Sequence, residues 1–266
     1  MKINEQMRWV VWVGALGIVG CGFLSESATS LLVPPSEEVK LGLELAAEVE
    51  LELVLHPDAQ VQAEFQAMGD QLIAVLSPDV PEEYVFEFKV VQDDDMINAF
   101  AAPGGQIYFY TGLFLAAGNQ AAVMGVLAHE IAHVTERHGA KQMVAQYGVE
   151  TVLQMALGTD EGSWTSLLAD LGTTGALLSY SRDDETEADI VGLDILVDAG
   201  YDPTPFADFF AVLGAEEGED NFLSFLSTHP AAGERAEELK ERIAAMGTVP
   251  TYQGDAAAWD AFLGSL

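Results

Sequence analysis

The strongest constraint on the fold is the pentapeptide His129-Glu130-Ile131-Ala132-His133, which lies inside an apolar stretch of the chain. In an α-helix each residue turns by about 100°, so His129 and His133 lie one turn apart on the same face. Burying two imidazoles and a carboxylate is costly unless a metal ion or hydrogen-bonding partners compensate for the lost hydration. The sequence therefore predicts a buried helix that carries a metal site.

Two histidines one helical turn apart form a common zinc-binding pair, and the glutamate beside them suits a separate role. Glu130 follows His129 directly, where its carboxylate can act as a general base toward a water molecule that zinc has made acidic. We therefore expect one Zn²⁺ per subunit, with Glu130 as the catalytic residue. The alternative interpretation is a pair of hydrogen-bonded helix histidines without a metal.

A third protein ligand has to come from outside the pentapeptide, because catalytic zinc is held by at least three protein side chains. His138 is five residues beyond His133, and a continuous helix would turn it about 140° away. Gly139 stands where another class of zinc peptidase has its third histidine. We therefore predict that His138 is a core or solvated side chain and not a ligand.

An acidic cluster later in the chain, Ser181 to Asp189, offers better candidates inside an otherwise apolar helix. Glu185 and Asp189 are four residues apart and share a helical face. One carboxylate can then bind the metal while the other orients a ligand imidazole. Asp183 and Glu187 fall on other faces and are predicted to be solvated charges, so Glu185 is the favoured third ligand.

Hydrophobic periodicity and turn residues predict a mainly helical α+β fold. The expected helices cover about 36–56, 58–76, 119–147, 166–199, 205–213, 231–246 and 255–263, and the expected strands lie within 85–91 and 98–110. The first range also alternates like a strand at 48–53, although helix formers dominate it. Asn119 is a suitable N-cap for the helix with the pentapeptide. The strands around the Pro-Gly-Gly turn at 103–105 predict a small antiparallel sheet just before that helix.

The charge balance argues against nucleic acid as a partner. The chain has 43 acidic and 10 basic residues, a formal net charge of −33, whereas phosphate binding requires clustered lysine and arginine. Repulsion among so many negative charges destabilises the folded state less where dissolved counterions screen it. A high-salt habitat and a lineage-specific composition without functional meaning are the two interpretations.

Residues 1–20 have the layout of an export signal, with basic residues before an apolar stretch. The tetrapeptide Ile18-Val19-Gly20-Cys21 is similar to the cleavage site of bacterial lipoproteins, which predicts lipidation of Cys21. We expect a tether over 21–35 and a zinc metallopeptidase domain over 36–266. An uncleaved signal anchor and plain secretion with a chance cysteine are the alternatives. The apolar stretch is shorter than the roughly 20 residues that a membrane span requires.

Several further segments occur in a characteristic order. They are Asn98-Ala99-Phe100, Pro103-Gly104-Gly105, Tyr110-Thr111-Gly112-Leu113, the helix from His129 to Gly139, Ser181 to Asp189, Gly200-Tyr201-Asp202-Pro203, Thr228-His229-Pro230 and Arg235. Together they resemble the membrane-associated gluzincins, the zinc metallopeptidases typified by BepA, LoiP, HtpX and Oma, over about residues 36–246. The chain most resembles the LoiP-type lipoproteins, because it lacks both the membrane-spanning helices and the helical repeats of other members.

The resemblance implies roles for particular residues. Glu185 would be the third zinc ligand, and Asp189 would stand behind the site in contact with His129. The strand formed by Asn98, Ala99, Phe100 and Ala101 would pair with an extended substrate.

Two later positions carry less direct implications. By resemblance, His229 would occupy the open zinc position and hold the enzyme inactive until substrate arrives. Arg235 would lie near the site, where it could help to stabilise the oxyanion. Without the resemblance, His229 is a loop residue before a proline and Arg235 is a surface helix charge.

The resemblance implies that the protein is a zinc-dependent endopeptidase with a zincin-like (gluzincin) domain. It would act on misfolded or stalled cell-envelope proteins. We expect it to be an outer-membrane lipoprotein that faces the periplasm. One rival interpretation is a chaperone-like assembly factor with a plugged zinc site. The other is a zinc hydrolase for non-peptide substrates.

Overall fold

The computed structural model describes residues 33–157, 180–215 and 225–266. The predicted export signal, Cys21 and most of the predicted tether lie outside the described residues, as does the first part of the helix expected over 166–199. The fold is mainly helical with one small sheet, as predicted.

The helices are α2 Pro35–Val49, α3 Ala59–Ile73, α4 Thr111–Ala117, α5 Gln120–Thr135, α6 His138–Tyr147, α7 Val149–Ala156, α9 Arg182–Asp198, α10 Thr204–Ala215, α12 Ala232–Met246 and α13 Ala256–Leu263. The strands are β1 Glu87–Val91, β2 Ala99–Ala101 and β3 Gln106–Tyr110. The first helix is shorter than the predicted range 36–56, and α4 and α7 were not predicted.

The sheet has the strand order β1-β3-β2 and is mixed rather than antiparallel. β2 and β3 form the predicted hairpin around the Pro-Gly-Gly turn, with Phe100 opposite Tyr108. β1 instead pairs with β3 in parallel, with Phe88 opposite Ile107. The antiparallel expectation is wrong for this pair, because the chain passes through β2 before it enters β3 and so returns in the same direction as β1.

The turn between β2 and β3 packs closely under α2. Gly104 has a φ of 77°, which favours glycine. A Cβ on Gly42 of α2 would lie 1.8 Å from the carbonyl oxygen of Pro103. The first described helix is therefore seated directly on the hairpin that borders the site.

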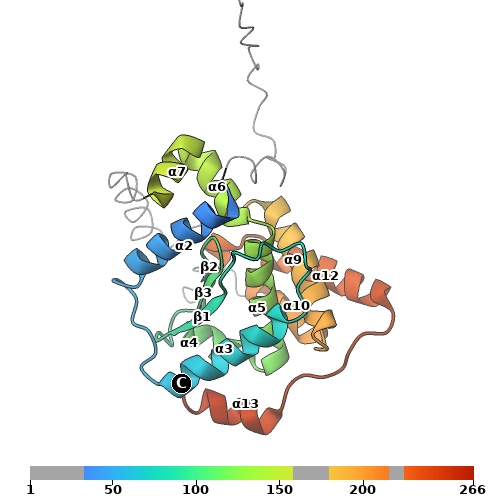
Figure 1. Ribbon diagram of the computed structural model, residues 1–266. Helices are drawn as coiled ribbons and strands as arrows, with labels where there is room; N and C mark the ends of the chain where they lie inside the picture. Colours follow the sequence, from blue (N-terminus) through green and yellow to red (C-terminus); the bar gives the residue numbers. More distant parts are fainter. Residues whose placement is uncertain (1–32, 158–179, 216–224) are drawn as a thin grey trace, which may run out of the picture.

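Helix α5 runs through the centre of the molecule, between the sheet on one side and α9, α10 and α12 on the other (Figure 1). Asn119 caps its start as predicted, because the side chain accepts a hydrogen bond from the Ala122 amide. Every residue from 121 to 134 is buried. A helix that is apolar all round in this way has to lie in the core.

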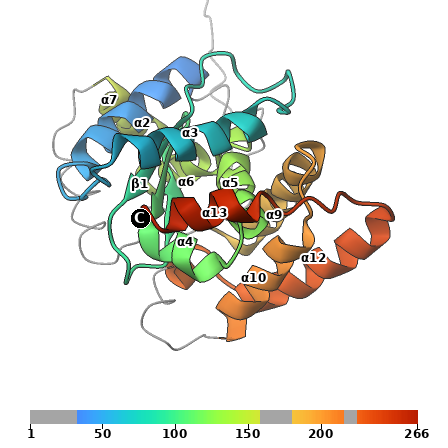
Figure 2. The same cartoon turned by 90° about the horizontal axis from the view of Figure 1, so that it is seen from below.

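The main core lies between α3, the sheet and α4. The ring of Phe65 contacts the rings of Phe109 and Phe114 at centroid distances of 5.0 and 5.1 Å. Helix α13 adds Phe262, whose ring lies 5.4 Å from that of Phe114. Burying each such side chain stabilises the fold by about 1.5–3 kcal/mol. Figure 2 shows α13 lying across this side of the molecule beside α3 and α4.

Helix α5 ends sooner than predicted. The predicted helix over 119–147 is two helices, because Arg137 adopts a left-handed conformation with a φ of 61°. The buried Arg137 donates to the Glu38 carboxylate at 2.7 Å and to the Val33 carbonyl at 2.6 Å. These contacts with α2 and with the residue Val33 before it stabilise a turn that contains no glycine or proline.

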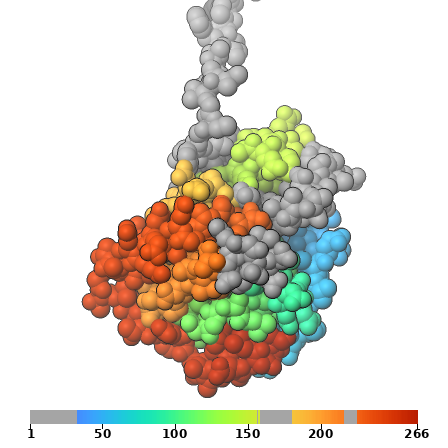
Figure 3. Space-filling model, turned by 180° about the vertical axis from the view of Figure 1, so that it is seen from behind, coloured from blue at the N-terminus to red at the C-terminus, as the bar shows by residue number. Residues whose placement is uncertain are grey.

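The face opposite to that of Figure 1 has a broad surface of C-terminal residues, coloured orange to red (Figure 3). Among the described helices, none combines the length and the apolar character that crossing a bilayer requires.

Candidate metal centre

Helix α5 brings both predicted histidines and the glutamate into the protein interior. His129 and Glu130 are 0% exposed and His133 is 1% exposed. The Nε2 atoms of the two histidines face each other at 3.0 Å. Two imidazole nitrogens this close, pointing at the same space, form half of a metal site.

Helix α9 supplies a carboxylate to the same space. Its start is determined locally, because Ser181 and Asp184 form a capping box and acidic residues suit the first turn of a helix. Glu185 follows one position later and is fully buried. Its Oε1 lies 3.3 Å from His133 Nε2 and its Oε2 lies 3.6 Å from His129 Nε2.

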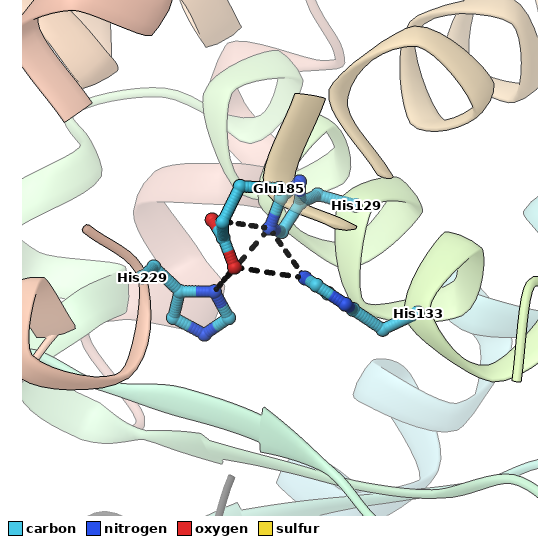
Figure 4. Close-up of side chains that lie close together, drawn as sticks. All are labelled: His129, His133, Glu185 and His229. Carbon is cyan, nitrogen blue, oxygen red and sulfur yellow. Dashed lines mark hydrogen bonds and ion pairs between the residues drawn. The ribbon is translucent and has the colours of Figure 1, made fainter. Parts of the chain in front are cut away.

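His229 completes the group from the segment before α12. Its Nδ1 lies 3.0 Å from Glu185 Oε1 and 3.4 Å from His129 Nε2. Figure 4 shows the three imidazoles around the Glu185 carboxylate. The four ligand atoms of His129, His133, Glu185 and His229 all lie within 4.8 Å of one another. His229 lies in a bend before Pro230, as its sequence position indicates, but it is fully buried and belongs to the cluster.

This donor set fits zinc. Four-coordinate zinc with bonds of about 2.0–2.1 Å is tetrahedral, which places neighbouring ligand atoms about 3.3 Å apart. Burial and the neighbouring His129 hold the pKa of His133 well below its usual value, so its ring is neutral and keeps a lone pair. Burial opposes ionisation of Glu185, but the facing His229 and Arg235 hold the pKa of its carboxyl well below the usual range. Neutral imidazoles and an ionised carboxylate are the forms that bind a metal.

Arg235 of α12 holds the carboxylates behind the site. Its Nε and Nη2 each donate to Asp189 at 2.6 Å, and its Nη1 donates to Glu185. Asp189 Oδ1 also lies 3.0 Å from His129 Nδ1. Arg235 is buried and its guanidinium lies 4.7 Å from the Phe210 ring centre, so the interpretation as a surface charge is wrong.

Glu130 stands beside the four-ligand cluster without joining it. Its two oxygens are buried and accept no hydrogen bond within the described part of the chain. Oε1 lies 3.3 Å from His229 Nε2. Burial raises the pKa of Glu130, and the facing His229 and His129 oppose this shift. Such a carboxylate is suited to accept a proton.

The predicted substrate strand borders the site. β2 pairs with β3 along one edge and packs against α5. No described strand pairs with its other edge. Asn98, just before β2, is buried, and its Oδ1 lies 3.5 Å from the hydroxyl of Thr228, next to His229. The strand predicted from Asn98 to Ala101 therefore lies next to the metal cluster.

Two neighbours of His133 were not predicted. The ring of Tyr180 stacks on the His133 ring at 3.7 Å. His138 is not among the four clustered ligands, but its Nδ1 lies 2.9 Å from His133 Nδ1. Glu187, predicted to be only solvated, contacts His138 Nε2 at 3.1 Å. Helical spacing could not reveal the contacts of His138, because they depend on the turn at Arg137.

Several known proteins resemble the chain over about three fifths of its length. The beta-barrel assembly-enhancing protease of Yersinia pestis is 31% identical over 179 residues, which is 62% of this chain and 36% of that protein. The mitochondrial metalloendopeptidase OMA1 of Schizosaccharomyces pombe is 31% identical over 159 residues, 59% of this chain and 46% of the relative. Metalloprotease YcaL of Escherichia coli is 31% identical over 160 residues, 59% of this chain and 62% of the relative.

The matched region therefore spans less than two thirds of the length of each of these relatives. Residues 59–243 also match the profile of Peptidase family M48, and this range contains all four clustered ligands together with Glu130, Asp189 and Arg235. Because the match covers most of the sequence, the chain belongs to peptidase family M48.

Proposed function

We propose that this protein is a zinc-dependent endopeptidase. The observation that carries the proposal is the buried Glu130 carboxylate, whose oxygens accept no hydrogen bond among the described residues, beside four clustered metal ligands. A buried carboxylate without donors is costly unless a ligand or reactant completes its surroundings. Because the chain belongs to a peptidase family, we infer that the reactant beside Glu130 is a water molecule that hydrolyses a peptide bond.

The clustered residues have two separate roles, metal binding and proton transfer. His129, His133 and Glu185 would hold the zinc ion. Bound there, zinc supplies Lewis acidity, which polarises a scissile carbonyl and lets a water molecule lose a proton near neutral pH. Glu130 takes that proton and later delivers it to the departing amine. Its raised pKa suits it to both steps.

Arg235 contributes by holding ligands rather than by touching the substrate. Three of its donor atoms are used by Asp189 and Glu185, so the oxyanion role considered for it has less support. The Asp189 carboxylate in turn faces the Nδ1 of His129. This arrangement leaves the His129 Nε2 lone pair directed at the metal.

His229 makes the site regulated. Its ring supplies one of the four clustered ligand atoms and lies against Glu130, so that with zinc bound it would take the place that a substrate carbonyl and the reacting water need. The segment that carries His229 therefore has to move before peptide hydrolysis. The same observation supports the second candidate function, a chaperone-like assembly factor whose metal site stays closed.

The substrates we propose are misfolded or stalled proteins of the cell envelope. An unfolded segment can add to the edge of β2 that no described strand occupies, through main-chain hydrogen bonds that do not require a particular sequence. The name of the Yersinia pestis relative, a beta-barrel assembly-enhancing protease, supports an envelope role. The location would be the periplasmic face of the outer membrane, with a LoiP-type lipid anchor on Cys21 after removal of residues 1–20. Mass spectrometry of the native protein for an acylated Cys21 tests the anchor.

The decisive variant is Glu130→Gln, which keeps the shape of the side chain and removes the base. We expect cleavage of an unfolded casein-like protein to fall by about 10²–10⁴-fold. Zinc content and the far-ultraviolet circular dichroism spectrum should match those of the parent. Cleavage at the parent rate would show that Glu130 is not the base.

The same variant separates the two candidate functions. If Glu130→Gln fully supports envelope assembly in a host that lacks the parent gene, the chaperone-like function is favoured. If it does not, proteolysis is required. Activity on ester substrates with none on unfolded protein would instead favour a non-peptide hydrolase.

A further inference from the structure

A chain of three side chains connects the metal centre to the protein surface. His133 Nδ1 lies 2.9 Å from His138 Nδ1, and His138 Nε2 lies 3.1 Å from Glu187 Oε2. His138 is 1% exposed, whereas half of the Glu187 side chain is exposed. The mechanism proposed above uses neither His138 nor Glu187.

The backbone turn after α5 creates this contact. On a continuous helix His138 would point well away from His133. The left-handed Arg137 turns the chain back, and His138 becomes the first residue of α6. Arg137 is held by the buried Glu38 carboxylate. The turn at Arg137, which Glu38 stabilises, therefore places His138 next to His133.

Metal binding determines the direction of the hydrogen bonds. His133 has to present an unprotonated Nε2 to the metal, so its proton resides on Nδ1 and is donated. His138 Nδ1 must then be the acceptor, which places the His138 proton on Nε2. Glu187 accepts that proton at 3.1 Å. Asp184, the other nearby carboxylate, is 3.7 Å from the same nitrogen and is already engaged in the capping box of α9.

The two histidine ligands are thus supported in different ways. His129 faces Asp189, a buried carboxylate fixed by Arg235. His133 faces a second imidazole, and its carboxylate stands one residue farther out. The Tyr180 ring stacked on His133 restrains the plane of the ring but offers no acceptor to Nδ1.

We propose that His138 is a positioning residue, which accepts the Nδ1 proton of His133 and thereby fixes the tautomer and orientation in which His133 binds zinc. Glu187 keeps His138 in the accepting tautomer. The proposal rests on the zinc site of the proposed function and adds a residue that is not itself a ligand. Partners of this kind around metal-binding histidines typically contribute 10- to 100-fold to metal affinity.

The test compares four variants by zinc titration against a chromogenic chelator. His138→Ala removes the acceptor, and we expect zinc affinity to fall by roughly 10- to 100-fold. His138→Asn places an amide oxygen where Nδ1 stood, so affinity should largely recover. Glu187→Ala should weaken binding by a smaller factor. Asp194→Ala removes an exposed carboxylate of the same helix and should match the parent.

A nitrogen–proton correlation spectrum of the imidazole rings in the zinc-loaded parent gives an independent readout. We expect the proton of His133 on Nδ1 and that of His138 on Nε2, and this measurement stands even if His138→Ala fails to fold. The proposal is overturned if His138→Ala binds zinc as tightly as the parent. It is equally overturned if His138→Asn is as weak as His138→Ala, or if His138 Nδ1 carries the proton.

These results are distinguishable from failure of the proposed function. If the parent binds zinc and cleaves unfolded protein while all four variants bind zinc equally, only the role of His138 is lost. A parent that binds no zinc would remove both the function and the positioning role.

Discussion

Gly192 of α9 lies against the backbone of His129 in α5. A Cβ at position 192 would lie 2.9 Å from both the Cα and the backbone nitrogen of His129. Real Cβ atoms do not approach backbone this closely, so the two helices would have to separate. Because α9 carries Glu185 and α5 carries His129 and His133, this close packing brings the Glu185 carboxylate within reach of the two imidazoles.

Gly192→Ala should therefore weaken both the fold and the metal site. We expect a loss of about 1–3 kcal/mol in the free energy of unfolding, as for other overpacked cores. Zinc affinity should fall in parallel, because Glu185 is displaced from His133. Urea unfolding and chelator competition measure the two effects. Gly264→Ala, at the exposed residue that follows α13, is the control and should change neither.

Arg235→Met should destabilise the zinc-free protein more than the zinc-loaded protein. Removing the guanidinium leaves the buried carboxylates of Glu185 and Asp189 without the arginine that pairs with both, a loss of about 3–5 kcal/mol. Zinc offsets the charge of Glu185, so the loss should shrink when the metal is bound. Urea unfolding with and without excess zinc measures the difference. Arg242→Met, at an exposed position of the same helix, should stay within about 0.5 kcal/mol of the parent.

His229→Ala should raise the rate of proteolysis if the closed site limits turnover. The substitution removes the fourth ligand and the contact with Glu130, while His129, His133 and Glu185 remain. Initial rates on an unfolded fluorogenic protein measure the effect. The double variant with Glu130→Gln is the control and should be inactive. An unchanged or lower rate for His229→Ala would contradict the regulatory role.

Glu38→Gln should destabilise the turn between α5 and α6. The buried Arg137 would keep its charge and lose its ionised partner, which costs about 3–5 kcal/mol. Glu37→Gln is a matched control one residue away, because Glu37 pairs with the exposed Lys40 and such pairs contribute about 0–1 kcal/mol. Thermal unfolding followed by circular dichroism compares them. Equal losses of stability for the two variants would show that the buried Glu38–Arg137 pair stabilises the fold no more than the exposed Glu37–Lys40 pair.

Features that depend on neighbouring residues could be predicted from the sequence. Asn119 was placed at the start of α5 because a side-chain oxygen there can satisfy a free backbone amide. The hairpin of β2 and β3 follows from the glycines in its turn. The proximity of Glu185 and Asp189 on one face is a consequence of helical geometry alone.

Features that depend on distant contacts could not be predicted. The left-handed Arg137 has no local signal and is held by Glu38, which lies 99 residues earlier in the chain. His138 was assigned by its spacing on a helix that ends before it. The parallel pairing of β1 and β3 likewise requires knowledge of where the intervening hairpin lies. Only the family resemblance predicts that His229 and Arg235 lie at the metal site, because no pattern in their own surroundings indicates it.

The residues of the metal centre lie far apart in the sequence, so they leave the ribosome at different times. His129 and His229 are 100 residues apart, and Arg235, which holds Glu185 and Asp189, emerges later still. A partly synthesised chain can present the pentapeptide but cannot assemble the complete centre. Closing such long loops occurs late in folding, once the helices that carry the residues have packed together. The protein would therefore acquire the ability to cut other chains only after its own folding is complete, which protects its unfinished copies from one another.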